Sequence, residues 1–282
     1  MTNEWTPKGG SFDVSELQNI NIYEDLPDVT ALSEAEIRAI RTGDLAPDVI
    51  APFGWDGSQF TTWRSLFDGK SLAIPDNTVA HYDASQLSLN DGDTVSVWPD
   101  EQGDNDLDIQ TGSPTYVESG INGNPAIAFN GDGLEVTGLS VTQPNTTYVV
   151  FEYQSGFDGG RVLSGVSKRQ ITPEADQSSN RWSIHGGQGR VFGTQDINIQ
   201  QMTAVFDGAN SIIREDGVEI AVGDAGTNYL GGLSVGYGAR GYDYGEGRHY
   251  ADAYVSEIVL VNSGSVDLDF ENQLLEKWGI TA

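Results

Sequence analysis

Residues 81–134 carry the clearest signal for the fold, and they read HYDASQLSLNDGDTVSVWPDEQGDNDLDIQTGSPTYVESGINGNPAIAFNGDGL. Short apolar segments at residues 95–98, 116–117 and 126–129 are separated by clusters of Gly, Asn and Asp. Gly, Asn and Asp supply the positive φ angles and the local hydrogen bonds that tight turns need. The stretch therefore predicts short antiparallel strands joined by tight turns.

The same pattern continues toward the C-terminus. Further predicted strands are residues 146–153, 202–206, 211–214, 233–237 and 253–261. The run at 146–153 is almost entirely β-branched or aromatic, which is typical of a central strand buried on both faces. Asp216-Gly217 predicts a tight hairpin, because both residues tolerate positive φ. Phe270, Leu274 and Trp278 lie four residues apart, and they predict a terminal helix that ends at Gly279.

Several short motifs in this region resemble one known group of proteins. They are His81-Tyr82-Asp83-Ala84-Ser85, Asp91-Gly92, Val95-Ser96-Val97-Trp98, Asp100, Gln102-Gly103, Gly123-x-Pro125, Phe129-x-Gly131, Ser256-Glu257-Ile258-Val259-Leu260-Val261 and Glu276-Lys277-Trp278-Gly279-Ile280. In this order they resemble the LamG-like branch of the concanavalin A-like lectin/glucanase superfamily, over roughly residues 78–282. The resemblance implies an all-β fold, a concanavalin A-like jelly-roll β-sandwich of two antiparallel sheets, over residues 76–282.

Residues 1–75 do not share this pattern. We expect a mostly irregular extension with one short helix, which Ser33 caps, Glu36 supports and Gly43 ends. The extension is too short to bury its tryptophans and phenylalanines by itself. It is therefore expected to dock on the sandwich, on another copy in a homo-oligomer, or on other proteins of a larger particle.

The charge of the chain excludes some partners. Acidic residues outnumber basic ones 42 to 14, which gives a formal net charge of -28. Such a chain repels itself at low ionic strength, and molar salt screens the repulsion. The composition fits either an acidic protein of ordinary habitat or a protein built for high salt, and the scarcity of lysine favours the second. No basic stripe is present to bind nucleic acid, and no apolar run is long enough to insert into a membrane.

The sequence offers little for catalysis. It contains no cysteine. Glucanases of the superfamily carry carboxylates in an E-x-D-x-E type pattern on one strand, and no such string occurs here. In the corresponding strand only Glu257 is acidic, and a strand acid is more often solvated or paired than catalytic. We therefore expect that the protein is not an enzyme.

Two groups of residues are candidates for binding. Sugars are bound by aromatic platforms with carboxylates and amides nearby, and a glycine-rich loop and a second polar-aromatic stretch supply both. The predicted ligand-binding residues are Tyr242, Asp243, Tyr244, Arg248 and Tyr250 in the loop, with Trp182 and His185 in the second stretch. An ordinary packed loop or a contact between subunits is the alternative.

The second candidate is a metal site in an acidic loop. Asp100, Asp104 and Asp106 could hold calcium, which prefers carboxylate oxygens, although the loop lacks the EF-hand pattern. The alternative is an acidic turn in an acidic protein.

Together these features lead to one expectation about function. The first residues, MTNEWTPKGG, lack the pattern of an export signal. We expect a non-enzymatic virion surface protein of a halophilic virus, a turret, spike or tail fibre that attaches to glycans or glycoproteins of the host cell surface. Residues 1–75 would bind other virion proteins. A purely structural capsid or tail component, and a secreted carbohydrate-binding module or glycan hydrolase, are the alternatives.

Overall fold

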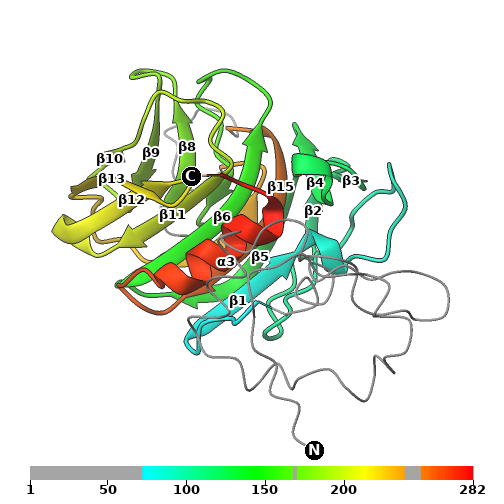
Figure 1. Ribbon diagram of the computed structural model, residues 1–282, viewed down its shortest axis with the longest axis horizontal. Coiled ribbons are helices and arrows are strands. Elements are labelled where there is room, and N and C mark those ends of the chain that lie inside the picture. The colour runs from blue at the N-terminus through cyan, green and yellow to red at the C-terminus, as the bar shows by residue number, and fades with distance from the viewer. Residues whose placement is uncertain (1–71, 168–169, 239–248, 282) are drawn as a thin grey trace, which may run out of the picture. The chain divides into compact units, whose positions relative to one another are not determined.

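The computed structural model describes residues 72–167, 170–238 and 249–281. These residues form two antiparallel β-sheets, and one α-helix lies on the outer face of one sheet (Figure 1). The fold class predicted from the sequence, an all-β sandwich with a C-terminal helix, is confirmed. The helix predicted to begin at Ser33 lies outside the described residues.

The larger sheet has eight strands. In spatial order they are β13 (Val218–Gly223), β12 (Ser211–Glu215), β11 (Gln201–Phe206), β6 (Asn145–Tyr153), β15 (Asp252–Val261), β4 (Ala126–Asn130) and β3 (Thr115–Val117), with β1 (Thr78–Asp83) also paired to β15. On the side away from β6, β15 pairs first with β4 and then, further along, with β1. This arrangement makes β15 the central strand of the sheet.

The smaller sheet has seven strands. In spatial order they are β10 (Val191–Phe192), β9 (Arg181–His185), β8 (Ile171–Asp176), β7 (Leu163–Ser164), β14 (Leu230–Val235), β5 (Gly133–Val141) and β2 (Ile109–Thr111). Three short 3-10 helices, η4 (Ala84–Gln86), η5 (Ile121–Gly123) and η6 (Gly208–Asn210), connect strands. Among the described residues, no helix is long and apolar enough to cross a membrane.

The main hydrophobic core lies between the two sheets. Phe151 of β6 and Ile258 of β15 face it from the larger sheet, and Trp182 of β9 and Val235 of β14 face it from the smaller one. All four side chains are almost completely buried. Strands in both sheets alternate between this core and an outer face, as the pleat of a strand requires.

A second apolar cluster lies under the C-terminal helix α3 (Leu268–Trp278). In Figure 1, α3 lies across the outer face of the larger sheet. Its Phe270, Leu274 and Trp278 pack there with Tyr148 of β6 and Val259 of β15. The side chain of Asp267 caps the first turn, and Gly279 ends the helix at a φ of 66°. The predicted helix and its stop are thus confirmed.

Most predicted strands are confirmed, and so is the hairpin between β12 and β13, where Asp216 and Gly217 have φ angles of 45° and 80°. Residues 95–98 differ from the prediction. They form no continuous strand, and the region makes only isolated bridges, from Thr94 to Thr115 and from Trp98 to Leu107. The Trp98 ring is nevertheless fully buried in the main core.

Candidate functional site

On the outer face of the larger sheet α3 packs over β6 and β15, and buried charges fasten the helix there. Glu257 of β15 is completely buried. It accepts hydrogen bonds from Lys277 Nζ at 2.6 Å and from the Trp278 indole N–H, and it contacts His81 Nε2 at 2.8 Å. Lys277 Nζ also lies 2.7 Å from Asp83 Oδ2. Burial alone would raise the pKa of Asp83, but the ammonium of Lys277 and the hydrogen bonds from Ser85 together outweigh burial and lower it.

A second ion pair fastens the first half of α3. Arg214 of β12 donates from Nε and Nη2 to the carboxylate of Glu271, at 3.0 and 2.8 Å. Thr203 of β11 donates its hydroxyl to the same carboxylate at 2.6 Å. Glu271 is 1% exposed, so its carboxylate is bound by Arg214 and Thr203 in place of water. These two sets of contacts hold α3 on the outer face of the larger sheet.

The outer face of the smaller sheet carries a different group of polar side chains, which we call the outer-face cluster: Arg161, Glu174, Asp176, Ser183, His185 and Arg190. Because Ala175, Trp182 and Ile184 face the core, their strand neighbours point away from it.

Glu174 is the centre of the outer-face cluster. It accepts from Arg161 Nε at 3.1 Å, from Arg190 Nη2 at 2.9 Å and from Ser183 Oγ at 3.2 Å. His185 Nε2 lies 3.0 Å from the same carboxylate. Burial would raise the pKa of Glu174, but the contact with His185 and the charges of both arginines hold it well below its usual range. Glu174 is therefore an ionised acceptor.

Asp176 lies two residues further along β8 and is equally buried. Its Oδ1 accepts from Ser178 Oγ at 2.7 Å and from the backbone and side chain of Ser179, both at 2.8 Å. Its Oδ2 pairs with Arg190 Nη1. Both carboxylates of β8 thus accept from several donors of the chain itself.

One edge of the outer-face cluster is open to solvent. The side chain of Arg190 is 27% exposed, although two of its nitrogens pair with Glu174 and Asp176. Its guanidinium lies over the ring of Phe192 on β10, 5.8 Å from the ring centroid. Phe192 is 37% exposed. An aromatic ring and a fixed guanidinium are therefore presented together at the edge of the sheet.

The predicted glycine-rich loop begins and ends beside the same cluster. Gly238 N–H donates to the carbonyl of His249 at 3.0 Å, and Tyr237 and Tyr250 form a β-bridge. A Cβ on Gly238 would lie 2.7 Å from the side chain of Arg161, so a residue larger than glycine would have to displace it.

The predicted binding residues are found in different places. Tyr242, Asp243, Tyr244 and Arg248 lie outside the described residues, and their role stays a prediction. Tyr250 is half-buried at the base of the loop. His185 belongs to the outer-face cluster but is 1% exposed.

Trp182 corrects the sequence-based expectation of an exposed platform. It is 0% exposed, because its position on β9 faces the core, and its indole packs edge-on against Phe151 and Tyr153. The indole N–H donates to the carbonyl of Asp196 at 2.6 Å.

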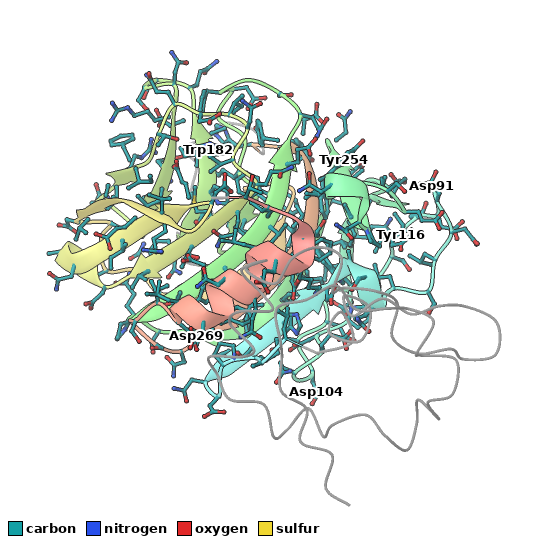
Figure 2. All side chains as sticks on the ribbon, viewed as in Figure 1. Asp91, Asp104, Tyr116, Trp182, Tyr254 and Asp269 are labelled. Atoms are coloured by element: carbon teal, nitrogen blue, oxygen red, sulfur yellow. The ribbon has the colours of Figure 1, made fainter. Side chains whose placement is uncertain are left out.

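The three candidate calcium ligands also differ from one another. Asp100 is buried, and its carboxylate accepts from the backbone N–H of His81 and Gln102 and from the side chain of Asn105. Asp106 accepts from the backbone N–H of Asp100 at 2.9 Å. Asp104 is exposed (Figure 2). Asp100 thus has the contacts of a residue that shapes a turn.

A different set of potential ligands lies closer together. Among the described residues, ligand atoms of His81, Asp83 and Glu257 lie within 4.8 Å of one another. The ammonium of Lys277 sits against both carboxylates of this set, at 2.7 and 2.6 Å. A cation of the chain itself therefore neutralises them.

The sequence did not lead us to predict the main polar residues on the outer face of the smaller sheet. Glu174 and Asp176 alternate on β8, so that the first half of an E-x-D-x-E pattern is present without its last acid. That alternation was the available signal. Phe192 lies in a strand of two residues, which is too short to show a pattern.

No family model matches the sequence, and no curated protein sequence matches it. Solved structures do show similarity. Domain 4 of AbnA, an extracellular GH43 arabinanase from Geobacillus stearothermophilus, matches with a TM-score of 0.48 and 14% identity over 70% of this chain and 98% of that one. A mutant Trypanosoma rangeli sialidase with trans-sialidase activity matches with a TM-score of 0.50 and 14% identity over 74% of this chain.

A third similar structure is the binding domain of botulinum neurotoxin serotype D/C, with a TM-score of 0.49 and 10% identity over 72% of this chain and 52% of that one. The chain covers 35% of the length of the sialidase. The similarity to the sialidase, at a TM-score of 0.50, extends to the fold and not to function. The pairing of its strands makes the described part of the protein an antiparallel two-sheet β-sandwich with a C-terminal helix.

Proposed function

We propose that the protein is a non-enzymatic attachment protein, which binds a glycan on the outer face of its smaller sheet. We further propose that it works on the surface of a virion of a halophilic virus, where residues 1–75 join it to other virion proteins. It would there contact glycans of the host cell surface, or decorate the particle.

The observation that supports this proposal best is the contrast between the two outer faces. On the larger sheet α3 covers the outer face over β6 and β15, and Glu257 and Glu271 hold it there through buried ion pairs. On the smaller sheet the outer face carries buried polar side chains, and its β10 edge exposes one guanidinium in part and one aromatic ring. Fixed polar groups beside an aromatic ring form the kind of surface that binds a sugar.

The absence of catalysis is proposed from the state of the acids. Glycoside hydrolysis needs one carboxyl group that donates a proton and a second that acts as nucleophile or base. Glu174 has a lowered pKa and accepts from two arginines, so it is a poor proton donor. Glu257, the only acid of the strand that the superfamily resemblance singled out, is enclosed by Lys277 and Trp278.

The high-salt environment is proposed from the charge. A net charge of -28 in 282 residues gives strong self-repulsion in dilute buffer. At molar salt the Debye length falls to about 3 Å, and the repulsion is largely screened. Attachment would therefore be measured, and would operate, in molar salt.

The test is a binding experiment with the full chain in molar salt. Labelled protein is incubated with intact halophilic cells and, separately, with virions that lack this protein, with and without calcium. We expect binding to cells that soluble surface glycans of the same cells compete away. Binding to virions alone, with none to cells, would contradict attachment and favour a structural component. Release of reducing sugar from the glycans would contradict the non-enzymatic proposal.

A further inference from the structure

We propose that the glycan-binding subsite is centred on Phe192 and Arg190 at the β10 edge of the smaller sheet, and that it takes an uncharged sugar. The inference rests on the proposed function and adds to it a location and a class of ligand.

The pairing of the strands places Phe192 on the outer face. Phe192 lies opposite Ser183 on β9, and Ser183 lies opposite Glu174 on β8. The next residue back, Val191, is buried in the main core. Successive side chains of a strand point to opposite faces, so the Phe192 ring points away from the core and toward the outer-face cluster.

Arg190 is held in place before any ligand arrives. Its Nη2 lies 2.9 Å from Glu174 Oε2, and its Nη1 pairs with Asp176. These two contacts use two of the five N–H donors of a guanidinium. The remaining donors belong to a side chain that is 27% exposed, next to a ring that is 37% exposed. A sugar can lie with its C–H face on the ring while its hydroxyl oxygens accept from the guanidinium, at little cost in side-chain entropy.

The charges in the cluster favour an uncharged ligand. The positive charges of Arg161 and Arg190 are matched by the negative charges of Glu174 and Asp176. A sulfate or a carboxylate on the sugar would therefore meet no unmatched cation among these four residues. The whole chain carries a net charge of -28 and repels polyanions at long range. Hydroxyl groups, which both donate and accept hydrogen bonds, suit a neutral surface of this kind.

The experiment uses matched polysaccharides and matched variants of the full chain. Neutral glucan, mannan, galactan and xylan, and a sulfated form of each, are immobilised on beads in molar salt. Phe192→Ala is compared with Phe192→Tyr, which keeps a ring, and with Ile109→Ala. Ile109 is 42% exposed on β2, the opposite edge strand of the same sheet. Thermal unfolding of each variant checks that it is folded.

We expect the native protein to be retained on at least one neutral polysaccharide. Phe192→Ala should bind it about five- to ten-fold more weakly, while Phe192→Tyr and Ile109→Ala bind normally. Retention on no neutral polysaccharide, stronger retention on the sulfated forms, or normal binding by Phe192→Ala would each overturn the subsite. Normal attachment of Phe192→Ala to cells would overturn the subsite alone, whereas failure of the native protein to bind cells would overturn the proposed function.

Discussion

The protein uses the same small arrangement twice, once on each sheet. In both places a cation lies over an aromatic ring and pairs with two carboxylates. On the larger sheet Lys277 lies 4.9 Å from the ring centroid of Trp278, and on the smaller sheet Arg190 lies 5.8 Å from that of Phe192. The rings differ in exposure, at 1% for Trp278 and 37% for Phe192.

The difference in ring exposure indicates that the two groups of buried charges have different roles. Trp278 and Lys277 belong to α3, and their contacts with Glu257 fasten the helix to the sheet. Phe192 and Arg190 fasten no helix, and their contacts hold a guanidinium beside an open ring. The first arrangement stabilises the fold, and the second prepares a surface.

The largest effect is expected from removing the two rings. Trp278→Ala should lower the free energy of unfolding by about 3–5 kcal/mol, because it leaves a cavity under α3 and removes a hydrogen bond to Glu257. Phe192→Ala should change it by less than about 1 kcal/mol. Urea denaturation at one fixed salt concentration measures both. Similar losses for the two variants would mean that the rings do not play different roles.

Removing the buried charge under α3 comes next. Glu257→Gln should cost roughly 3 kcal/mol, because Lys277 and His81 lose their common partner. Glu276→Gln, on the exposed side of the same helix, is the matched control and should cost less than about 0.5 kcal/mol. If the two substitutions have equal effects in urea denaturation, Glu257 does not fasten the helix.

The pH dependence of stability should report on the outer-face cluster and on the buried charges under α3. Asp83 and Glu174 have lowered pKa values in the folded protein, so each contributes stability that is present above its ordinary pKa and is lost as the pH falls. Glu174→Gln should cost about 1–3 kcal/mol at pH 7. The difference from the native protein should shrink below about pH 4.5, the ordinary range of a Glu carboxyl. Denaturation midpoints measured from pH 7 to pH 3 test this, and a constant difference would contradict it.

The smallest effect is expected in the acidic loop, where the two interpretations of the aspartates can be separated. If Asp100 shapes a turn, Asp100→Ala should cost about 2 kcal/mol whether calcium is present or chelated, because four N–H donors lose their acceptor. Asp104→Ala should leave the melting temperature unchanged in both conditions. A calcium-dependent shift that either substitution abolishes would instead support an ion in this loop.

The sequence predicts the fold well because the signals for its elements are local. The alternation of apolar and turn residues, the Asp216-Gly217 hairpin and the Gly279 stop each depend on neighbouring residues, and each is confirmed. The site is predicted poorly because its residues meet only through strand pairing. Arg161 and Arg190 are 13 and 16 residues away from Glu174, and nothing near β8 indicates that both converge on it.

Trp182 shows a second reason. An aromatic residue next to an arginine and a serine suits an exposed platform or a strand that alternates between core and surface. Only the pairing of β9 with β8 and β10 determines which of its side chains faces the core. The shift of a single position would exchange the faces of Trp182 and Ser183, and local composition does not fix that choice.

We propose that the outer face of the smaller sheet binds the glycan, while α3 covers the outer face of the larger sheet. Hydrogen–deuterium exchange of the full chain in molar salt, with and without the soluble surface glycans of cells that it binds, tests this most directly. We expect the glycans to slow exchange in β8, β9 and β10 and to leave α3 and β15 unchanged. Protection of α3 or β15 with none in β8 to β10 would contradict the claim.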